Sequence, residues 1–564
     1  MNTRLWTPDK DKVSKANLTH FTSYIENKYG VNFEHYPELH QWSIEQKEQF
    51  WLSIVEFFNV KGSFDDTPIF ETGDSFQQNR WFPEATLNFA ENLLPKRNSD
   101  LAIVEHNEHG DRKTLTYAQL YDEVERIAAS MRELGITKGD RVAGFIPNCS
   151  EAIIAMLATA SIGAIWSSCS PDFGLNGVID RLGQIQPKLL FATNGYYYSG
   201  KRISTTERVD QITKQLPELI KLVMVNYLDD EPSIEYGVNH CDWQAMTPSQ
   251  HQPLTFTPVN FSDPLYIMYS SGTTGVPKCI VHGVGGTLLQ HIKELALHTN
   301  LKASDNIFYY TTCGWMMWNW FVSSLSQGAT LTLFDGSPFY PSPKVLFNIA
   351  EQEKISIFGA SAKYYAACDK VGLTPNKTHD LHSLNTLLST GSPLAHETFD
   401  YLYGSVKSDI CVSSISGGTD IISCFALGNA TLPVYRGELQ CAGLGMDVAF
   451  YDDNGHSLNE GKGELVCKTP FPSMPTHFWS DEKGIKYSKA YFEAFDNCWA
   501  HGDYGEIINH TDDAGNLTQQ GIIIHGRSDA ILNPGGVRIG TAEIYRQVEK
   551  IDSVEESIAI GQKW

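Results

Sequence analysis

The chain has 564 residues, of which 42% are hydrophobic and 19% are charged. This length and composition predict a globular protein of several domains rather than a disordered one. The net charge of −23, from 66 acidic and 43 basic residues, argues against a general nucleic-acid or anionic-membrane surface. We therefore expect any polyanionic substrate to be held by local hydrogen-bond donors and a metal ion, against the overall field.

The first residues, MNTRLWTPDKDK, lack the apolar core of a signal peptide, and no apolar run reaches about 18 residues. Eleven cysteines, from Cys149 to Cys498, are scattered without a CxxC pair. That spacing is typical of reduced, mostly structural thiols. The sequence therefore predicts a cytoplasmic protein without a membrane span.

The amino-terminal region is aromatic and acidic, with helical patterning from Ser43 to Asn59. An α/β pattern then begins. The segment from Leu115 to Gly135 predicts a helix capped by Thr116, and the segment from Arg141 to Asn148 predicts a strand. Gly285 to His298 predicts an amphipathic helix. Alternation of this kind indicates layered sheets with helices outside.

The segment from Tyr269 to Lys278 reads YSSGTTGVPK and lies between two apolar runs, LYIM and CIVH. We interpret it as a strand, a phosphate-gripping turn and a second strand, because glycines let backbone N–H groups approach an anion closely. It is not a Walker A loop, since Gly272 and Gly275 are too close together and Lys278 does not follow a glycine. An ordinary hydroxyl-rich turn is the alternative interpretation of this composition alone.

The order of these residues resembles the signature of the adenylate-forming superfamily, which includes acyl-CoA synthetases, firefly luciferases and nonribosomal adenylation domains. The resemblance implies an α/β fold, with a large amino-terminal adenylate-forming domain of layered sheets and helices and a small carboxy-terminal α+β domain. It places an acyl-CoA synthetase extension at residues 1–110, the large domain at 111–528 and the start of the small domain at 529–564.

The superfamily stacks adenine on a turn that corresponds to Gly391, Ser392 and Pro393, although STGSP alone is only a turn signal. Its Thr–acid pair corresponds to Thr419 and Asp420. The threonine contacts the α-phosphate, and the acid holds Mg²⁺. Aspartate is a suitable hard ligand but is one methylene shorter than the family's glutamate, so coordination through a water is the firmer expectation.

In the motif HGDYGEI, the resemblance implies that Asp503 accepts hydrogen bonds from both ribose hydroxyls, although a solvated turn aspartate is the alternative. Arg527 would reach the ribose, and Arg538 would approach the phosphates. The full set of expected ATP-binding residues is Ser271, Gly272, Thr273, Thr274, Gly275, Lys278, Gly391, Ser392, Pro393, Ser414, Ile415, Ser416, Gly417, Gly418, Thr419, Asp503, Arg527 and Arg538. The residues expected to act in catalysis are Thr273, Lys278 and Thr419, with Asp420 as the metal ligand.

The aromatic run from Phe308 to Leu325 would by default be core. In the superfamily this stretch lines the acyl and coenzyme A channels, so Trp315, Met316 and Met317 become candidates for the acyl pocket. Acetyl-CoA synthetases carry a bulky tryptophan at the position of Gly417. Its absence here predicts room for a four-carbon acid and poor use of acetate.

The family's hinge between the large and small domains corresponds to Asp529, and coenzyme A passes close to the backbone at the position of Gly535. The family's small domain ends in a lysine that contacts the carboxylate and α-phosphate. Here the sequence stops at IGQKW, and Lys563 is not in that motif. We therefore expect a truncated small domain and impaired adenylation.

The segments TTCGWMMWNW, YRGELQCAGLGM, PFPSMP and LNPGGVRIGTAEIY together resemble acetoacetyl-CoA synthetases. This implies ATP-dependent ligation of acetoacetate to coenzyme A through an acyl-adenylate, giving acetoacetyl-CoA, AMP and pyrophosphate. The implied partners are ATP, Mg²⁺, coenzyme A and the acid, with no nucleic acid or membrane. Two alternatives stay open: a CoA ligase for another short-chain acid, or a truncated nucleotide-binding paralogue without adenylation activity.

Overall fold

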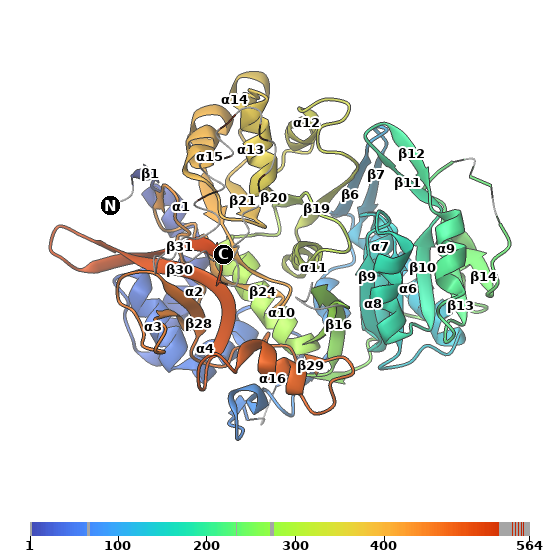
Figure 1. The fold of residues 1–564 in the computed structure, drawn as a ribbon, viewed down its shortest axis with the longest axis horizontal. Coiled ribbons are helices and arrows are strands. Elements are labelled where there is room, and N and C mark those ends of the chain that lie inside the picture. Colours follow the sequence, from blue (N-terminus) through green and yellow to red (C-terminus); the bar gives the residue numbers. More distant parts are fainter. Residues whose placement is uncertain are drawn as a thin grey trace, which may run out of the picture.

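The structure is a computed structural model that describes residues 3–64, 68–229, 231–232, 234–270 and 276–528, together with positions 544, 548, 551, 554 and 557. Two large sheets, each flanked by helices, stand side by side, and a smaller antiparallel sheet lies beside them (Figure 1). This arrangement confirms the predicted α/β class with layered sheets. Across the described segments, no helix is both long and apolar enough to cross a membrane.

The eight-stranded sheet has the order β14-β13-β10-β8-β9-β16-β17-β29. Its strands are β8 (Arg141–Phe145), β9 (Ile165–Cys169), β10 (Leu189–Thr193), β13 (Lys221–Val225), β14 (His240–Asp242), β16 (Pro264–Ser270), β17 (Lys278–Gly283) and β29 (His477–Phe478). The strands from β14 to β16 run parallel, and β17 and β29 continue the sheet antiparallel. The predicted strand after Arg141 is therefore confirmed as β8.

Helices cover both faces of this sheet, as the parallel strands require. Val142 packs with α6 (Tyr117–Glu133) and α7 (Ser150–Ile162), whereas Ala143 packs with α8 (Leu175–Ile185) and α9 (Thr206–Thr213). Helix α6 begins with a capping box in which Thr116 and Gln119 satisfy each other's backbone N–H groups. The predicted cap at Thr116 is thus confirmed.

The seven-stranded sheet has the order β22-β21-β20-β18-β19-β6-β7 and is parallel apart from the β6–β7 hairpin. Its strands are β6 (Leu101–Asn107), β7 (Arg112–Thr116), β18 (Asn306–Tyr309), β19 (Thr330–Asp335), β20 (Ile357–Ser361), β21 (Thr386–Thr390) and β22 (Cys411–Ser414). Helices α12 (Val345–Gln352), α13 (Ala362–Lys370), α14 (Pro375–Thr378) and α15 (His396–Tyr401) gather beside it, at the top of Figure 1. The predicted domain boundary at residue 110 falls inside the β6–β7 hairpin.

Two smaller sheets complete the body. Strands β23 (Ser416–Gly418), β24 (Ser423–Leu427) and β26 (Cys441–Ala442) form one. Strands β27 (Val448–Tyr451), β28 (Gly463–Cys467), β30 (Trp499–Thr511) and β31 (Leu517–Arg527) form the other. The β30–β31 hairpin extends past the rest of the molecule, and α16 (Ile485–Tyr491) lies at the lower edge of the view (Figure 1).

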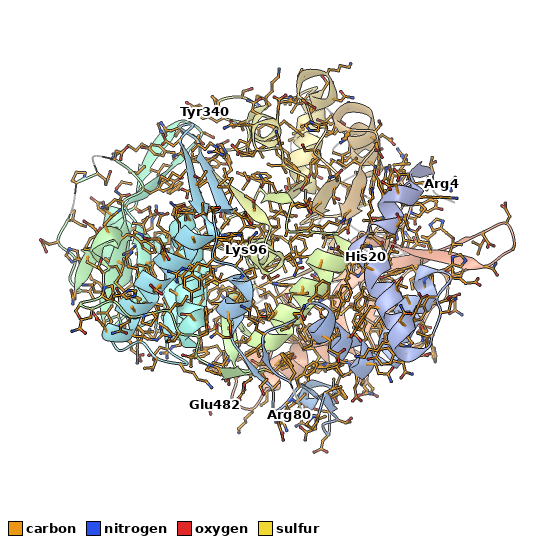
Figure 2. The ribbon with its side chains drawn as sticks, turned by 180° about the vertical axis from the view of Figure 1, so that it is seen from behind. Arg4, His20, Arg80, Lys96, Tyr340 and Glu482 are labelled. Atoms are coloured by element: carbon orange, nitrogen blue, oxygen red, sulfur yellow. The ribbon has the colours of Figure 1, made fainter. Side chains whose placement is uncertain are left out.

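The amino-terminal helices are α1 (Lys10–Ser14), α2 (Asn17–Tyr29), α3 (Tyr36–Glu45), α4 (Lys47–Phe57) and α5 (Phe89–Leu93). The helical pattern predicted from Ser43 to Asn59 is confirmed by the end of α3 and by α4. From behind, His20 marks these helices, while Arg80 and Glu482 lie at one edge of the molecule (Figure 2). The rings of Phe76 and Phe492, from segments far apart in the sequence, are 5.5 Å apart.

The central segment after β17 is α10 (Val284–Ile292), which continues as a π-helix over Lys293–His298. The predicted helix is confirmed, but it has no exposed polar face, because every residue from Val284 to His298 is buried. Helices α2 and α4 and strand β24 pack against this segment, so its polar side chains find partners inside the protein. Strand β18 and then α11 (Met316–Val322) follow it in the chain.

Short strands connect these elements. They are β1 (Arg4–Trp6), β2 (Gly62–Ser63), β3 (Phe70–Glu71), β4 (Arg80–Trp81), β5 (Thr86–Leu87), β11 (Gly195–Tyr198), β12 (Lys201–Ser204), β15 (Val259–Asn260) and β25 (Val434–Tyr435). All 11 cysteines lie in described segments, none forms a disulfide, and each is buried except the half-buried Cys241. The prediction of unpaired, mostly structural thiols is confirmed.

Candidate active site

The strands on either side of the predicted phosphate-gripping turn form a hairpin. Ser270 ends β16 and pairs directly with Lys278, the first residue of β17. Strand β16 runs parallel to β9, so the turn follows the carboxyl end of a parallel strand, where open α/β sheets bind their ligands. The turn residues themselves, Ser271, Gly272, Thr273, Thr274 and Gly275, lie outside the described residues.

Lys278 and Asp420 are far apart in sequence and form an ion pair, with Nζ 3.0 Å from Oδ1. The Tyr491 hydroxyl donates to the same carboxylate oxygen and lies 3.4 Å from the lysine Nζ. The side chains of Lys278 and Asp420 are 31% and 20% exposed, so solvent or a ligand can reach the pair. The structure thus brings two sequence-predicted residues together.

Burial by itself raises the pKa of Asp420, but the charge of Lys278, with His501 and the Tyr491 hydroxyl, holds this pKa below its usual value. Asp420 is therefore ionised at neutral pH, and Lys278 neutralises it. An anion that approaches Lys278 has to compete with Asp420 for the ammonium group.

Asp503 and Arg527 face each other across the β30–β31 pair. Arg527 Nη1 lies 3.3 Å from Asp503 Oδ1 and donates to the His501 carbonyl at 3.0 Å. The Asp503 side chain is 12% exposed and that of Arg527 is 53% exposed. The arginine therefore has room to turn towards a ligand while its partner stays in place.

Aromatic side chains connect these two pairs. The ring of Tyr491 stacks on that of Trp499, with 3.8 Å between centroids, and Trp499 Nε1 lies 3.3 Å from His501 Nδ1. His501 Nε2 lies 3.8 Å from Asp503 Oδ2, and burial lowers the pKa of this histidine. We call the following set the outer network: Lys278, Asp420, Tyr491, Trp499, His501, Asp503 and Arg527.

Sequence reasoning missed three members of the outer network, Tyr491, Trp499 and His501. Trp499 and His501 belong to the segment WAHGDYGEI that carries Asp503, so the motif itself could have pointed to them. Tyr491 ends α16 in a stretch without a motif, and only the tertiary fold brings it to Asp420.

The predicted adenine turn lies where β21 ends. Gly391 has φ of 92°, a left-handed conformation that glycine adopts without strain. A Cβ added there would lie 3.5 Å from the ring of Trp315, so the adenine turn and this acyl-pocket candidate are neighbours. The Thr390 hydroxyl, at the end of β21, donates to the carbonyl of Ile415, directly after the neighbouring strand β22, at 2.9 Å. Ser414 and Ile415 are buried, whereas Ser392 is exposed.

The acyl-pocket candidates divide into two kinds. Trp315 is half-buried, whereas Met316 and Met317 are each 4% exposed and belong to the main hydrophobic core. The two methionines therefore occupy core positions in this structure, as expected by default for an aromatic, apolar run.

The argument from Gly417 needs correction. A Cβ at position 417 would lie 2.1 Å from the Ser423 carbonyl oxygen and 2.4 Å from Cys424 Cα, because β24 passes directly beside it. The missing indole therefore leaves no open space in this direction. At the neighbouring Gly418, a Cβ would meet no atom within 4 Å. The structure therefore has open space at position 418 and none at position 417.

The residues present are compatible with Mg²⁺ that arrives with its nucleotide. Among the described residues, no group of three or more His, Cys, Asp or Glu side chains could hold a metal by itself. Mg²⁺, however, usually keeps several waters and binds through one or two carboxylates plus substrate phosphates. Asp420, an ionised carboxylate beside the phosphate-loop hairpin, fits that need.

The chain matches two family models: "AMP-binding enzyme" over residues 93–475 and "Acetyl-coenzyme A synthetase N-terminus" over residues 36–93. It is 50% identical to acetoacetyl-coenzyme A synthetase from Rhizobium meliloti, over 99% of this chain and 85% of the relative. This chain belongs to the acetoacetyl-CoA synthetase family of AMP-binding enzymes.

Other members of the acetoacetyl-CoA synthetase family are also similar to this chain over nearly its whole length. The Gallus gallus protein is 44% identical over 99% of this chain and 84% of its own length. The solved acetoacetyl-CoA synthetase from Streptomyces lividans superposes with a TM-score of 0.91 at 38% identity, covering 100% of this chain and 85% of that one. These comparisons give no support to the predicted truncation of the small domain or to impaired adenylation.

Three predicted positions near the carboxyl end, Asp529, Gly535 and Arg538, lie outside the described residues, as does Lys563. The hinge at Asp529, the coenzyme A contact at Gly535 and the phosphate contact at Arg538 therefore stay predictions. Lys563 received no role from the sequence.

Proposed function

We propose that this chain ligates acetoacetate to coenzyme A at the expense of ATP, through an acyl-adenylate. The observation that carries the proposal is the outer network, which joins a phosphate-loop lysine, an ionised aspartate and a ribose-type aspartate in one accessible site. The acetoacetate specificity rests on the relatives, which are named acetoacetyl-CoA synthetases.

In the first step, a carboxylate oxygen of the acid attacks the α-phosphorus of ATP, and the bond to the pyrophosphate oxygen breaks. Lys278 would leave Asp420 and neutralise the phosphates, and the Thr419 hydroxyl would contact the α-phosphate. Mg²⁺, when held by Asp420, supplies charge neutralisation for the leaving pyrophosphate. Asp503 would accept hydrogen bonds from the ribose hydroxyls, with Arg527 beside it.

In the second step, the coenzyme A thiol attacks the acyl carbon, and AMP leaves with the electron pair of the anhydride bond. No protein nucleophile takes part, so the buried cysteines need no chemical role. Catalysis in both steps comes from positioning and from preorganised charge.

Acid-dependent exchange of labelled pyrophosphate into ATP tests the proposal. We expect exchange with acetoacetate to exceed that with acetate, butyrate and 3-hydroxybutyrate, and coenzyme A to convert the adenylate to a thioester. If exchange were faster with another short acid, that acid would replace acetoacetate as the proposed substrate. Retained AMP binding without exchange for any acid would overturn the ligase and leave a nucleotide-binding protein.

A further inference from the structure

The turn between β23 and β24 carries Thr419 and Asp420 and is strained. Ile422 has φ of 49°, a left-handed conformation that a β-branched residue adopts only at a cost. The turn's own hydrogen bonds are long: Ile421 N lies 3.2 Å from the Gly418 carbonyl, and Ile422 N lies 3.4 Å from the Thr419 carbonyl. Contacts from outside must hold this backbone in place.

Two buried histidines, His282 at the end of β17 and His291 in α10, contact the carbonyl groups of the turn. His282 Nε2 lies 2.9 Å from the Thr419 carbonyl oxygen, and His291 Nε2 lies 2.6 Å from that of Ile422. Burial lowers the pKa of both histidines, to about 3 for His282, so they are neutral. A neutral imidazole donates through one nitrogen only, and here that nitrogen faces the carbonyl.

Glu294 holds the far end of the same turn. Its Oε1 accepts the Ser423 hydroxyl at 2.5 Å and the Cys424 N–H at 3.3 Å. Lys293 neutralises it, with Nζ 3.4 Å from Oε1, and both side chains are completely buried. A buried carboxylate whose oxygens are satisfied in this way fixes its partners firmly, because losing one leaves an unpaired charge.

His291 and Glu294 also hold α11. His291 Nδ1 lies 2.8 Å from the Ser323 hydroxyl, directly after α11, and Glu294 Oε2 accepts the Trp320 indole N–H at 2.8 Å. Trp315, which flanks the predicted adenine turn, is the residue directly before this helix. His291 and Glu294 therefore connect the turn that carries Asp420 to the helix behind the acyl-pocket candidates. We call His291, Lys293 and Glu294 the inner cluster.

We propose that His291 and Glu294 are positioning residues for the ligation, which keep the Thr419–Cys424 turn in register with α11. This inference rests on the proposed function for its chemistry. The two residues touch no substrate. They act by holding the turn in place despite the strain at Ile422, which fixes Thr419 and Asp420 so that the acid and the α-phosphate meet in line.

His298 offers a matched control within the same central segment, at the end of the π-helix that continues α10. It is as deeply buried as His291, but its ring contacts lead elsewhere: Nδ1 lies 3.0 Å from the Gly428 carbonyl oxygen, and Nε2 accepts the Leu444 N–H at 3.1 Å. His291→Ala and His298→Ala therefore remove the same buried side chain, and only one of them holds the turn.

We expect both alanine variants to lower the melting temperature to a similar extent. His291→Ala should lower kcat for pyrophosphate exchange at least tenfold, whereas His298→Ala should stay within twofold of wild type. Equal kcat losses in the two variants would overturn the proposal. Should either alanine variant fail to fold, the comparison is repeated with His291→Gln and His298→Gln, with the same expected difference.

A second pair tests Glu294 through its indole partner. Trp320→Phe removes the N–H that Glu294 accepts, whereas Trp318→Phe, on the same helix, removes an N–H that donates to Asn148 Oδ1 at 3.0 Å. Trp320→Phe should change the preference for acetoacetate over butyrate at least threefold, and Trp318→Phe should not. An unchanged preference in Trp320→Phe would overturn the claim that Glu294 positions the turn relative to α11.

Hydrogen–deuterium exchange separates failure of this inference from failure of the proposed function. His291→Ala should accelerate amide exchange in peptides covering residues 419–424, and His298→Ala should do so near residues 428–444. This readout needs no acid substrate. A wild-type chain without ligase activity would overturn the function alone, whereas unchanged exchange at residues 419–424 in His291→Ala would overturn the positioning role.

Discussion

Two polar clusters contact the Thr419–Cys424 turn, the outer network at Asp420 and the inner cluster from Ile422 to Cys424, and they differ in burial. In the outer network, Lys278 and Arg527 are 31% and 53% exposed, and their partners are carboxylates that a ligand can reach. In the inner cluster, Lys293 and Glu294 have no exposed side-chain surface. One cluster can exchange its partners for a substrate, and the other cannot.

This difference separates two uses of charge. An exposed ion pair contributes little to stability, because solvent screens it and a competing ion can replace either partner. A buried pair fixes the positions of the groups around it. Removing one partner is costly, because the remaining charge is left buried without solvent or a counter-charge. We therefore expect mutations in the outer network to change activity and mutations in the inner cluster to change stability first.

The largest effect should follow Glu294→Leu, which leaves Lys293 buried without its partner. We expect a loss of about 3–5 kcal/mol in the free energy of unfolding, measured by urea denaturation. The control is Asp11→Asn, which removes the exposed partner of Lys15 and should leave the unfolding midpoint unchanged. Equal midpoints for Glu294→Leu and wild type would show that the inner cluster is not structural.

Asp420→Ala should come next and act on activity. Removing the carboxylate takes away the expected metal ligand, and we expect acid-dependent pyrophosphate exchange to fall about 100-fold or more. Lys278 is half-buried and can then reach solvent, so the melting temperature should change little. Asp400→Ala, which breaks a surface pair with Arg436, is the control and should keep full exchange activity. If Asp420→Ala lost much stability but kept its exchange activity, the outer network would be structural rather than functional, contrary to our expectation.

The two glycines before Thr419 test how tightly the turn fits β24. Gly417→Ala should destabilise by about 1–3 kcal/mol, because its Cβ would overlap the Ser423 carbonyl. Gly418→Ala points into open space and should be nearly neutral for stability while reducing room for the acid. Thermal unfolding and a panel of acids measure the two effects. Similar unfolding of both variants would contradict the close packing of β24.

The sequence predicted the motif-bearing strands and helices well, because their patterns are local. Thr116 caps α6 through contacts within one turn, and Ser270 pairs with Lys278 across one short hairpin. It predicted the helix of the central segment but not its burial, because the burial of Lys293 and Glu294 depends on elements that lie far away in the chain. In a sequence, a neighbouring Lys and Glu indicate a solvent-exposed helix face, because charged residues are rarely fully buried. Only the tertiary structure shows which elements cover them.

For the site, the resemblance named Lys278, Asp420 and Asp503, and the structure brings them into one network. It could not supply Tyr491, which reaches Asp420 from 71 positions away without a motif. It also misjudged Gly417, because a missing side chain predicts free volume only when the neighbouring backbone leaves that volume open. Here β24 occupies it.

The smallest effect should separate two glycines that share a left-handed conformation. Gly391 has φ of 92° and faces Trp315, whereas Gly372 has φ of 68° and would meet no atom within 4 Å. Alanine at either position should cost about 1–2 kcal/mol of stability through backbone strain alone. Only Gly391→Ala should also raise KM for ATP, by about three- to tenfold, since it displaces the turn beside Trp315. An equal KM for ATP in both variants would mean that this turn holds no adenine, and the nucleotide would then depend on the outer network alone.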